Sequence, residues 1–118
     1  MKLSTRHSET RPWGSFVVHE SEPRHWIKTI VVSAGCRNSL QSHAHREEFW
    51  IVVAGHGSVV LGDQTLPAVP GAAFVVPVGL RHRMIAAPDS DMVIAEVALG
   101  RPQEDDIVRH EDEYGRAT

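Results

Sequence analysis

The stretch Gln41-Ser42-His43-Ala44-His45-Arg46-Glu47-Glu48 decides the fold that we predict for this chain. Side chains two residues apart on an extended strand point to the same face, so Gln41, His43 and His45 are expected to project together. Glu48 breaks this parity and must reach the same point after a bend or bulge. Because imidazole nitrogens and a carboxylate oxygen suit a divalent transition metal, the stretch predicts a metal site on a β scaffold.

A further histidine, His82, ends the segment Pro77-Val78-Gly79-Leu80-Arg81-His82, directly after a tight turn. We expect the rest of the chain to return it to the strand of the histidine pair. Only neutral imidazole binds metal, so metal affinity should fall at acid pH. The predicted metal ligands are His43, His45, Glu48 and His82, with Gln41 as an additional or replacement ligand.

Short apolar runs bounded by Gly, Pro, Asn and Asp fill the rest of the chain. No segment shows a helical period, whereas runs at this spacing are typical of strands in a sandwich or barrel. A jelly roll of two sheets fits about nine or ten strands. Besides the motif strand, we expect strands at 16–19, 24–33, 49–53, 58–61, 64–66, 72–76, 82–87 and 92–99.

Composition limits the class of protein. The 118 residues, 42% of them hydrophobic, suit one globular domain. No apolar run reaches the roughly 18 residues of a membrane span, and the first residues lack an apolar signal core. A single cysteine, Cys36, fits a reducing cytoplasm, and a net charge of −3 gives no indication of nucleic acid or membrane as a partner.

Charge is unevenly distributed along the chain. We expect residues 1–10 to be a flexible N-terminal segment and residues 11–118 to form the single domain, with an acidic tail over about 104–118. That tail holds six of the 15 carboxylates, so residues 1–103 carry ten basic and nine acidic groups. The body of the domain can therefore accept an anionic small molecule without overall repulsion.

Two motifs resemble those of the cupin superfamily. Residues 35–55 resemble the first cupin motif, with a glycine, the His-x-His pair, a glutamate and a second glycine. Residues 71–82 resemble the second, with Gly71, Pro77, Gly79 and His82 at the family spacing. The resemblance implies an all-β cupin double-stranded β-helix, that is, a jelly-roll barrel, with a metal held inside it.

A narrower resemblance covers about residues 11–116. It is carried by Arg11-Pro12-Trp13-Gly14, by the motif stretch, by Val75-Val76-Pro77 and by the segment 104–116. These are similar to type II mannose-6-phosphate isomerases, in which this domain usually follows a mannose-1-phosphate guanylyltransferase domain. The resemblance implies interconversion of mannose 6-phosphate and fructose 6-phosphate with a divalent metal. Zinc is expected first, while manganese, iron, cobalt and nickel suit the same ligands.

Moving a proton between C1 and C2 of a sugar requires a stabilised oxyanion and a positioned acid or base. Lys28 aligns with a lysine of the family and is a candidate for proton transfer or phosphate binding. Arg46 and Arg81 adjoin the predicted ligands, and arginine suits phosphate. Immediate neighbours of a ligand on a strand point the other way, so both arginines contribute only if the backbone turns there.

Other functions remain open at this point. Ala44, Phe49 and Trp26 stand where the isomerase family often has His, His and Lys, which bears on sugar specificity. A non-catalytic, metal-stabilised sugar-binding or regulatory cupin and an isomerase of a free sugar are the alternatives. A metal-dependent oxygenase or decarboxylase is a third, because the same ligands hold iron or manganese. By analogy with small cupins we also expect a homodimer.

Overall fold

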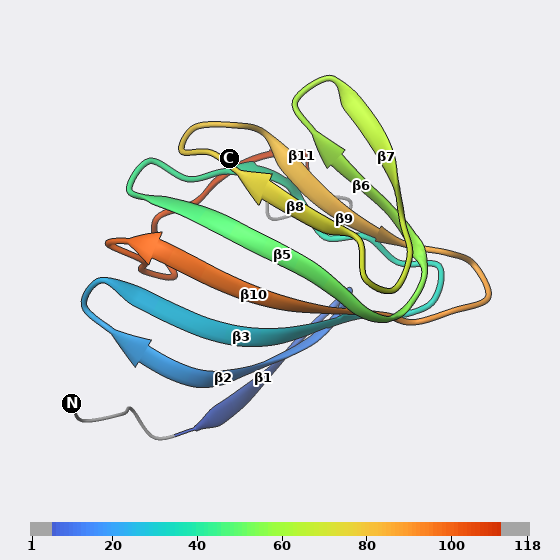
Figure 1. The fold of residues 1–118 in the computed structure, drawn as a ribbon, viewed down its shortest axis with the longest axis horizontal. Helices are drawn as coiled ribbons and strands as arrows, with labels where there is room; N and C mark the ends of the chain where they lie inside the picture. Colours follow the sequence, from blue (N-terminus) through green and yellow to red (C-terminus); the bar gives the residue numbers. More distant parts are fainter. Residues whose placement is uncertain (1–5, 112–118) are drawn as a thin grey trace.

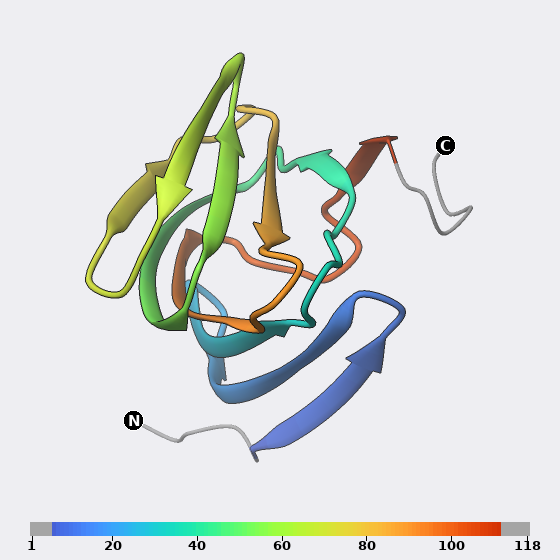
Figure 2. The same ribbon diagram turned by 90° about the vertical axis from the view of Figure 1, so that its right-hand side faces the viewer.

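A computed structural model describes residues 6–111, and all of its regular elements are strands. They form two antiparallel sheets, one of six strands in the order β1-β2-β3-β10-β5-β8 and one of five in the order β11-β4-β9-β6-β7 (Figures 1 and 2). The strands are β1 (His7–Arg11), β2 (Gly14–Glu22), β3 (His25–Val32), β4 (Leu40–Ser42), β5 (Arg46–Gly55), β6 (Gly57–Leu61), β7 (Gln64–Ala68), β8 (Ala73–Val76), β9 (His82–Ala86), β10 (Met92–Gly100) and β11 (Val108–Glu111).

The three central strands of the six-stranded sheet bury alternate residues. β3, β10 and β5 each point one set of side chains into the barrel and the other set outward, as the two-residue period of a strand requires. Their antiparallel register places Glu96 of β10 beside Lys28 of β3 and Trp50 of β5. Ile94, two residues earlier, lies beside Ile30 and therefore continues the same inward row.

The interior is apolar at one end and charged at the other. Around Ile94 and Met92 the inward side chains are aliphatic, and they pack into the hydrophobic core. At the other end of the barrel, near Trp50, the inward side chains of β5, β3 and β10 are those of Glu48, Lys28 and Glu96. These three are buried as deeply as the core residues. Because buried charges require partners, the charged end is where the sequence departs from a simple packed core.

The five-stranded sheet brings distant parts of the chain to this charged end. Gln41 of β4 pairs with His82 of β9 on one side and with Arg109 of β11 on the other. Figure 2 shows β11 beside β4 at one side of this sheet, with β6 and β7 at the other. The C-terminal strand therefore closes the barrel near the histidine motif.

The sequence-based expectations are largely confirmed. The structure is an all-β jelly roll, and each expected strand is present within a few residues. Of the segment 1–10 that we expect to be flexible, His7 to Thr10 form most of β1 and pair with β2; residues 1–5 lie outside the described part. The acidic tail likewise contributes a strand, β11, before residues 112–118, which also lie outside it. Residues 6–111 include no helix that could span a membrane.

The outer face of the six-stranded sheet is apolar. Ile51, Val53 and Val75 expose about half of their surface there, at 51%, 56% and 54%. Exposed apolar surface of this kind is compatible with the homodimer that we expect. The dimer itself stays a prediction.

Gly55 at the end of β5 offers a test of the fold. Its φ is +72°, and an added Cβ would lie 1.7 Å from the carbonyl oxygen of Asp91. We expect Gly55→Ala to lower the free energy of unfolding by more than about 1 kcal/mol, measured by urea denaturation. Gly71→Ala is the matched control, because its φ is +90° but no atom lies within 4 Å of the added Cβ. Equal losses in the two variants would contradict a steric role for Gly55.

Candidate metal centre and cavity

His43 enters the site where β4 ends. After Ser42 the backbone bends instead of continuing as a strand, and Asp106 fixes the bend. The Asp106 carboxylate accepts hydrogen bonds from the backbone N–H groups of Ala44 and His45, both at 2.9 Å. Its backbone carbonyl accepts a hydrogen bond from His43 Nδ1 at 2.6 Å. The loop before β11 therefore sets both the turn and the orientation of the His43 ring.

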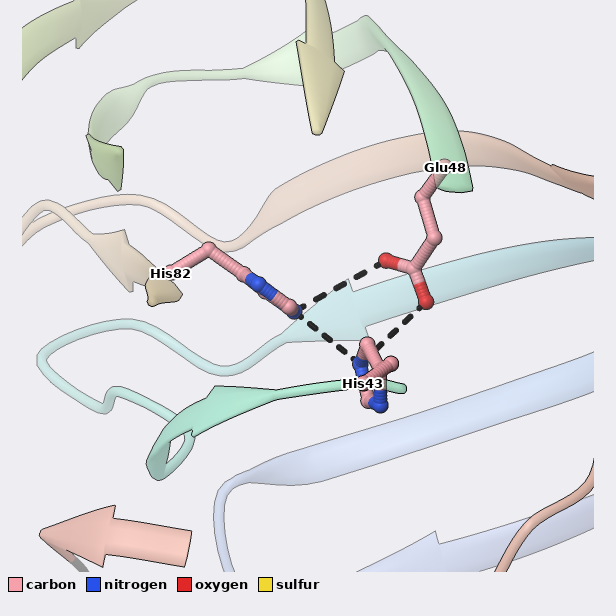
Figure 3. A group of neighbouring side chains, drawn as sticks. All are labelled: His43, Glu48 and His82. Atoms are coloured by element: carbon pink, nitrogen blue, oxygen red, sulfur yellow. Dashed lines mark hydrogen bonds and ion pairs between the residues drawn. The ribbon is translucent and has the colours of Figure 1, made fainter. Parts of the chain in front are cut away.

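His43, Glu48 and His82 come together from three separate elements (Figure 3). The two Nε2 atoms of His43 and His82 are 3.1 Å apart. Glu48 faces both rings: Oε2 is 3.4 Å from His43 Nε2, and Oε1 is 3.8 Å from His82 Nε2. All three side chains are buried, and one ligand atom from each lies within 4.8 Å of the others.

The hydrogen bonds of the two rings leave both Nε2 lone pairs directed into the same space. His43 donates its Nδ1 proton to Asp106, and His82 Nδ1 donates to the carbonyl of Leu80 at 2.9 Å. A neutral imidazole carries one proton, so each Nε2 is an acceptor. Two acceptors 3.1 Å apart repel each other unless a donor or a cation lies between them. Arg46 Nη2, which donates to His43 Nε2 at 3.1 Å, meets part of this requirement.

Glu48 is a buried carboxylate that cationic and N–H groups surround. Arg46 Nε donates to its Oε2 at 2.7 Å, and Trp50 Nε1 donates to its Oε1 at 3.0 Å. Burial by itself would raise the pKa of Glu48, but His82, His43 and Arg46 lower it to about 2. Since Arg46 keeps its charge at all working pH values, Glu48 remains anionic at neutral pH.

The two imidazoles are held in their neutral form. Burial lowers the pKa of His43 to about 4, and the charge of Arg46 adds to this effect while that of Glu48 opposes it. Burial also lowers the pKa of His82. Neutral imidazole is the ligand form, so protons compete with a metal less strongly here than at exposed histidines.

These residues fit a divalent transition metal. Two ligand atoms that each lie about 2.0–2.1 Å from one ion are roughly 2.9–3.4 Å apart at tetrahedral or octahedral angles. The His43–His82 distance of 3.1 Å and the His43–Glu48 distance of 3.4 Å fall in that range, and the His82–Glu48 distance of 3.8 Å lies outside it. The Nδ1 bonds to backbone carbonyls are the arrangement that metal-binding histidines commonly show. His43, Glu48 and His82 would therefore hold the ion.

The centre opens onto a cavity of about 150 Å³, which Glu48 and His82 line. This is room for on the order of ten water-sized spheres, which suits a small molecule of sugar size. Its wall also includes the charged and amide groups of Arg11, Lys28, Asn38, Gln41, Arg46, Glu96, Glu104 and Arg109.

The comparison with protein families identifies the chain's relatives. The family described as "Mannose-6-phosphate isomerase C-terminal" matches residues 1–112, nearly the whole chain. The chain belongs to this family. Similar proteins include XanB of Xanthomonas campestris, a xanthan biosynthesis protein that is 40% identical over 107 residues, or 90% of this chain and 23% of XanB. AlgA of Pseudomonas aeruginosa, an alginate biosynthesis protein, is also 40% identical over 107 residues, 90% of this chain and 22% of AlgA.

A mannose-1-phosphate guanylyltransferase of Klebsiella pneumoniae is 34% identical over 113 residues, 94% of this chain and 24% of that protein. The chain thus spans about a quarter of the length of the curated relatives it matches. Among solved structures, CapF of Staphylococcus aureus superposes with a TM-score of 0.76 at 21% identity, over 91% of this chain and 34% of CapF. KdgF of Halomonas sp. gives a TM-score of 0.71 at 20% identity, over 86% and 90%. These likenesses confirm the cupin-type barrel.

Within this member of the mannose-6-phosphate isomerase C-terminal family, two predicted site residues lie elsewhere. His45 is exposed and outside the His43–Glu48–His82 group, so the expectation that it projects beside His43 is wrong. The bend after β4 breaks the strand alternation on which that expectation rested. Arg81 is also exposed and outside the cavity, because it immediately precedes the inward-facing His82.

The other predicted residues lie at the cavity. Gln41 lines it and donates to Ser39 Oγ at 3.1 Å. Arg46 is buried because the bend lets β5 begin with an inward side chain. The Lys28 ammonium lies 3.7 Å from the ring centroid of Trp26 and 4.4 Å from that of Phe16, and it forms an ion pair with Glu104.

Sequence reasoning missed Glu96 and Asp106. Glu96 is the one charged residue in the apolar sequence of β10. Its place among the inward positions of that strand could have indicated a buried functional carboxyl group. Burial and the nearby Glu48 charge raise its pKa to about 8, and Trp26 Nε1 donates to its Oε2 at 2.9 Å. Asp106 lies in the acidic tail, and no local pattern distinguishes it from Asp105.

The metal centre can be tested by substitution. We expect His43→Ala and His82→Ala to weaken Co²⁺ or Zn²⁺ binding by metal-stripped protein at least tenfold, because each removes one of three ligand atoms. His45→Ala is the matched control from the same turn and should bind like the unaltered chain. Visible absorption of bound Co²⁺ measures the affinity. Loss of binding in His45→Ala as large as in His43→Ala would show that the exposed ring is a ligand after all.

The buried carboxyl pair predicts a pH dependence in metal-free protein. The pKa of Glu96 is raised in the folded state to about 8, so its contribution to stability is complete below pH 4.5 and is lost as the pH rises towards 8. The lowered pKa of His43 acts in a different window, reducing stability as the pH falls from 6.5 towards 4.

Between pH 6.5 and 8 the Glu96 contribution should therefore decline with rising pH, by up to about 1.4 kcal/mol per pH unit. Urea denaturation at four pH values measures it. Glu96→Gln should remove this decline, whereas Glu47→Gln, on the outer face of β5, should keep it. Parallel stability curves for Glu96→Gln and the unaltered chain would rule out a proton held by Glu96.

Proposed function

We propose that this chain is a metal-dependent isomerase that interconverts mannose 6-phosphate and fructose 6-phosphate. The observation that carries the proposal is the buried His43–Glu48–His82 group at the wall of a small cavity with cationic side chains. Membership of the mannose-6-phosphate isomerase C-terminal family supports the same reaction class. Zinc is the metal we expect first. The proposal includes a cytoplasmic location and a homodimer.

The metal, when bound, would polarise the carbonyl oxygen of the open-chain sugar and so stabilise the enediol. The chain's own residues have separate tasks. Arg46 positions the ligands, since it holds Glu48 and reaches the backbone carbonyl of Gln103 at 2.8 Å. Trp50 fixes the second oxygen of Glu48 from the opposite side.

Proton transfer requires a group on the cavity wall that can hold or release a proton. Glu96 is the carboxyl that burial keeps protonated at neutral pH, so it is suited to donate a proton to a sugar oxygen. Lys28, its register neighbour on β3, lies on the same wall and stays the second candidate. The sugar carbon must come within hydrogen-bond reach of one of them.

A sugar-binding or regulatory role without catalysis is the alternative, and one observation favours it. Lys28 is paired with Glu104 and Arg46 with Glu48, so two of the cations expected to act on substrate already have anionic partners. A binding module needs no base within reach of the substrate carbon. An isomerase of a free sugar would need no cation at the cavity mouth at all.

A coupled assay for fructose 6-phosphate formed from mannose 6-phosphate tests the proposal. Metal-stripped protein is reloaded in turn with Zn²⁺, Mn²⁺, Co²⁺ and Ni²⁺. We expect turnover that depends on the metal and falls at least a hundredfold in His82→Ala, because that variant loses a ligand. Arg81→Gln, which changes an exposed side chain next to His82, is the control and should keep its activity.

Two results would count against the isomerase. No turnover with any metal, from folded protein that binds one, would leave sugar binding as the function. Turnover of free mannose at the same rate as mannose 6-phosphate would instead identify a free-sugar isomerase.

A further inference from the structure

The Arg109 side chain lacks a hydrogen-bond acceptor, among the described residues, for one of its N–H groups inside the cavity. It lies on β11 opposite Gln41, and both residues line the cavity wall. Its Nε is buried and has no hydrogen-bond partner. A buried donor of a charged group normally finds an acceptor, because leaving it unpaired costs free energy. The missing acceptor is therefore expected to be a ligand.

Two buried arginines, Arg46 and Arg83, show what the half-buried Arg109 lacks. Arg46 Nε is 2.7 Å from a Glu48 oxygen, and Arg83 Nη1 is 3.4 Å from a Glu111 oxygen. Within residues 6–111, no carboxylate forms an ion pair with Arg109. Its guanidinium thus remains available for an anion that enters the cavity.

Lys28 supplies a second positive charge to the same cavity, from β3 of the six-stranded sheet. Its side chain is only 6% exposed, while that of its partner Glu104 is 54% exposed and belongs to the loop before β11. An ion pair with one solvated partner exchanges readily, because the exposed carboxylate regains its hydration when it leaves. Glu104 therefore occupies a position at the cavity that another anion can take.

We propose that Arg109 and Lys28 form the subsite for the phosphate group of the substrate, and that Glu104 is the internal anion which this phosphate displaces. This inference rests on the proposed function, since it assigns the phosphate end of the sugar phosphate. A phosphate monoester carries up to two negative charges and three acceptor oxygens, so it can accept from a guanidinium fork and an ammonium at once. Arg46 stays with the metal ligands, and Arg81 takes no part.

Isothermal titration of the metal-free full chain with inorganic phosphate and with mannose 6-phosphate tests the subsite. Metal-free protein is used so that phosphate cannot bind to a metal. We expect Arg109→Gln to weaken both ligands at least tenfold. Arg109→Lys, which keeps the charge but loses the fork, should lie in between. Glu104→Gln should bind more tightly, because it removes the competing carboxylate. Arg81→Gln, an exposed arginine outside the cavity, should change affinity less than twofold.

Affinity in Arg109→Gln and Arg109→Lys equal to that of the unaltered chain would overturn the subsite, as would no phosphate binding at millimolar concentration. Circular dichroism establishes that each variant is folded. The isomerase assay separates this outcome from failure of the function. An active chain in which Arg109→Gln leaves KM for mannose 6-phosphate unchanged would refute the subsite alone. An inactive chain whose phosphate binding depends on Arg109 would refute the isomerase alone.

Discussion

The site depends on keeping Glu48 ionised inside the barrel. A carboxylate that is 2% exposed is stable as an anion only if donors and positive charge surround it. Arg46 and Trp50 supply these from the same strand, because residues two apart on β5 share its inward face. Glu96 lies opposite Trp50 on the neighbouring strand β10, and burial together with the nearby Glu48 charge raises its pKa to about 8. Placement of one anion thus sets the charge state of its neighbours.

The loop before β11 completes the site from the far end of the chain. Asp106 fixes the backbone turn that directs His43 inward and His45 outward, and it accepts the Nδ1 proton of His43. Glu104 in the same loop pairs with Lys28. The segment that composition alone describes as an acidic tail therefore orients His43 and contributes to the lining of the cavity. A change in this loop should alter both metal and anion binding.

Much of this arrangement followed from local pattern. The short apolar runs bounded by turn residues and the two histidine-containing motifs together predicted the jelly roll, with His43, Glu48 and His82 in one place. The apolar periodicity was sufficient because each strand buries one face, which fixes its register. His45 was misplaced because alternation holds only while the strand continues, and a bend held by Asp106 ends it.

By itself, then, the sequence determined the all-β fold, the three residues of the His43–Glu48–His82 group and the place of Gln41, Lys28 and Arg46 as candidates. Only the tertiary structure decided which arginines line the cavity: Arg11, Arg46 and Arg109 do, and Arg81 does not. It also decided that Glu96 is protonated and that Asp106 orients His43. The physical reason is that burial and contacts with residues far away in the sequence set the pKa of Glu96 and the orientation of His43. The two-residue period of a single strand does not depend on such contacts and therefore cannot predict them.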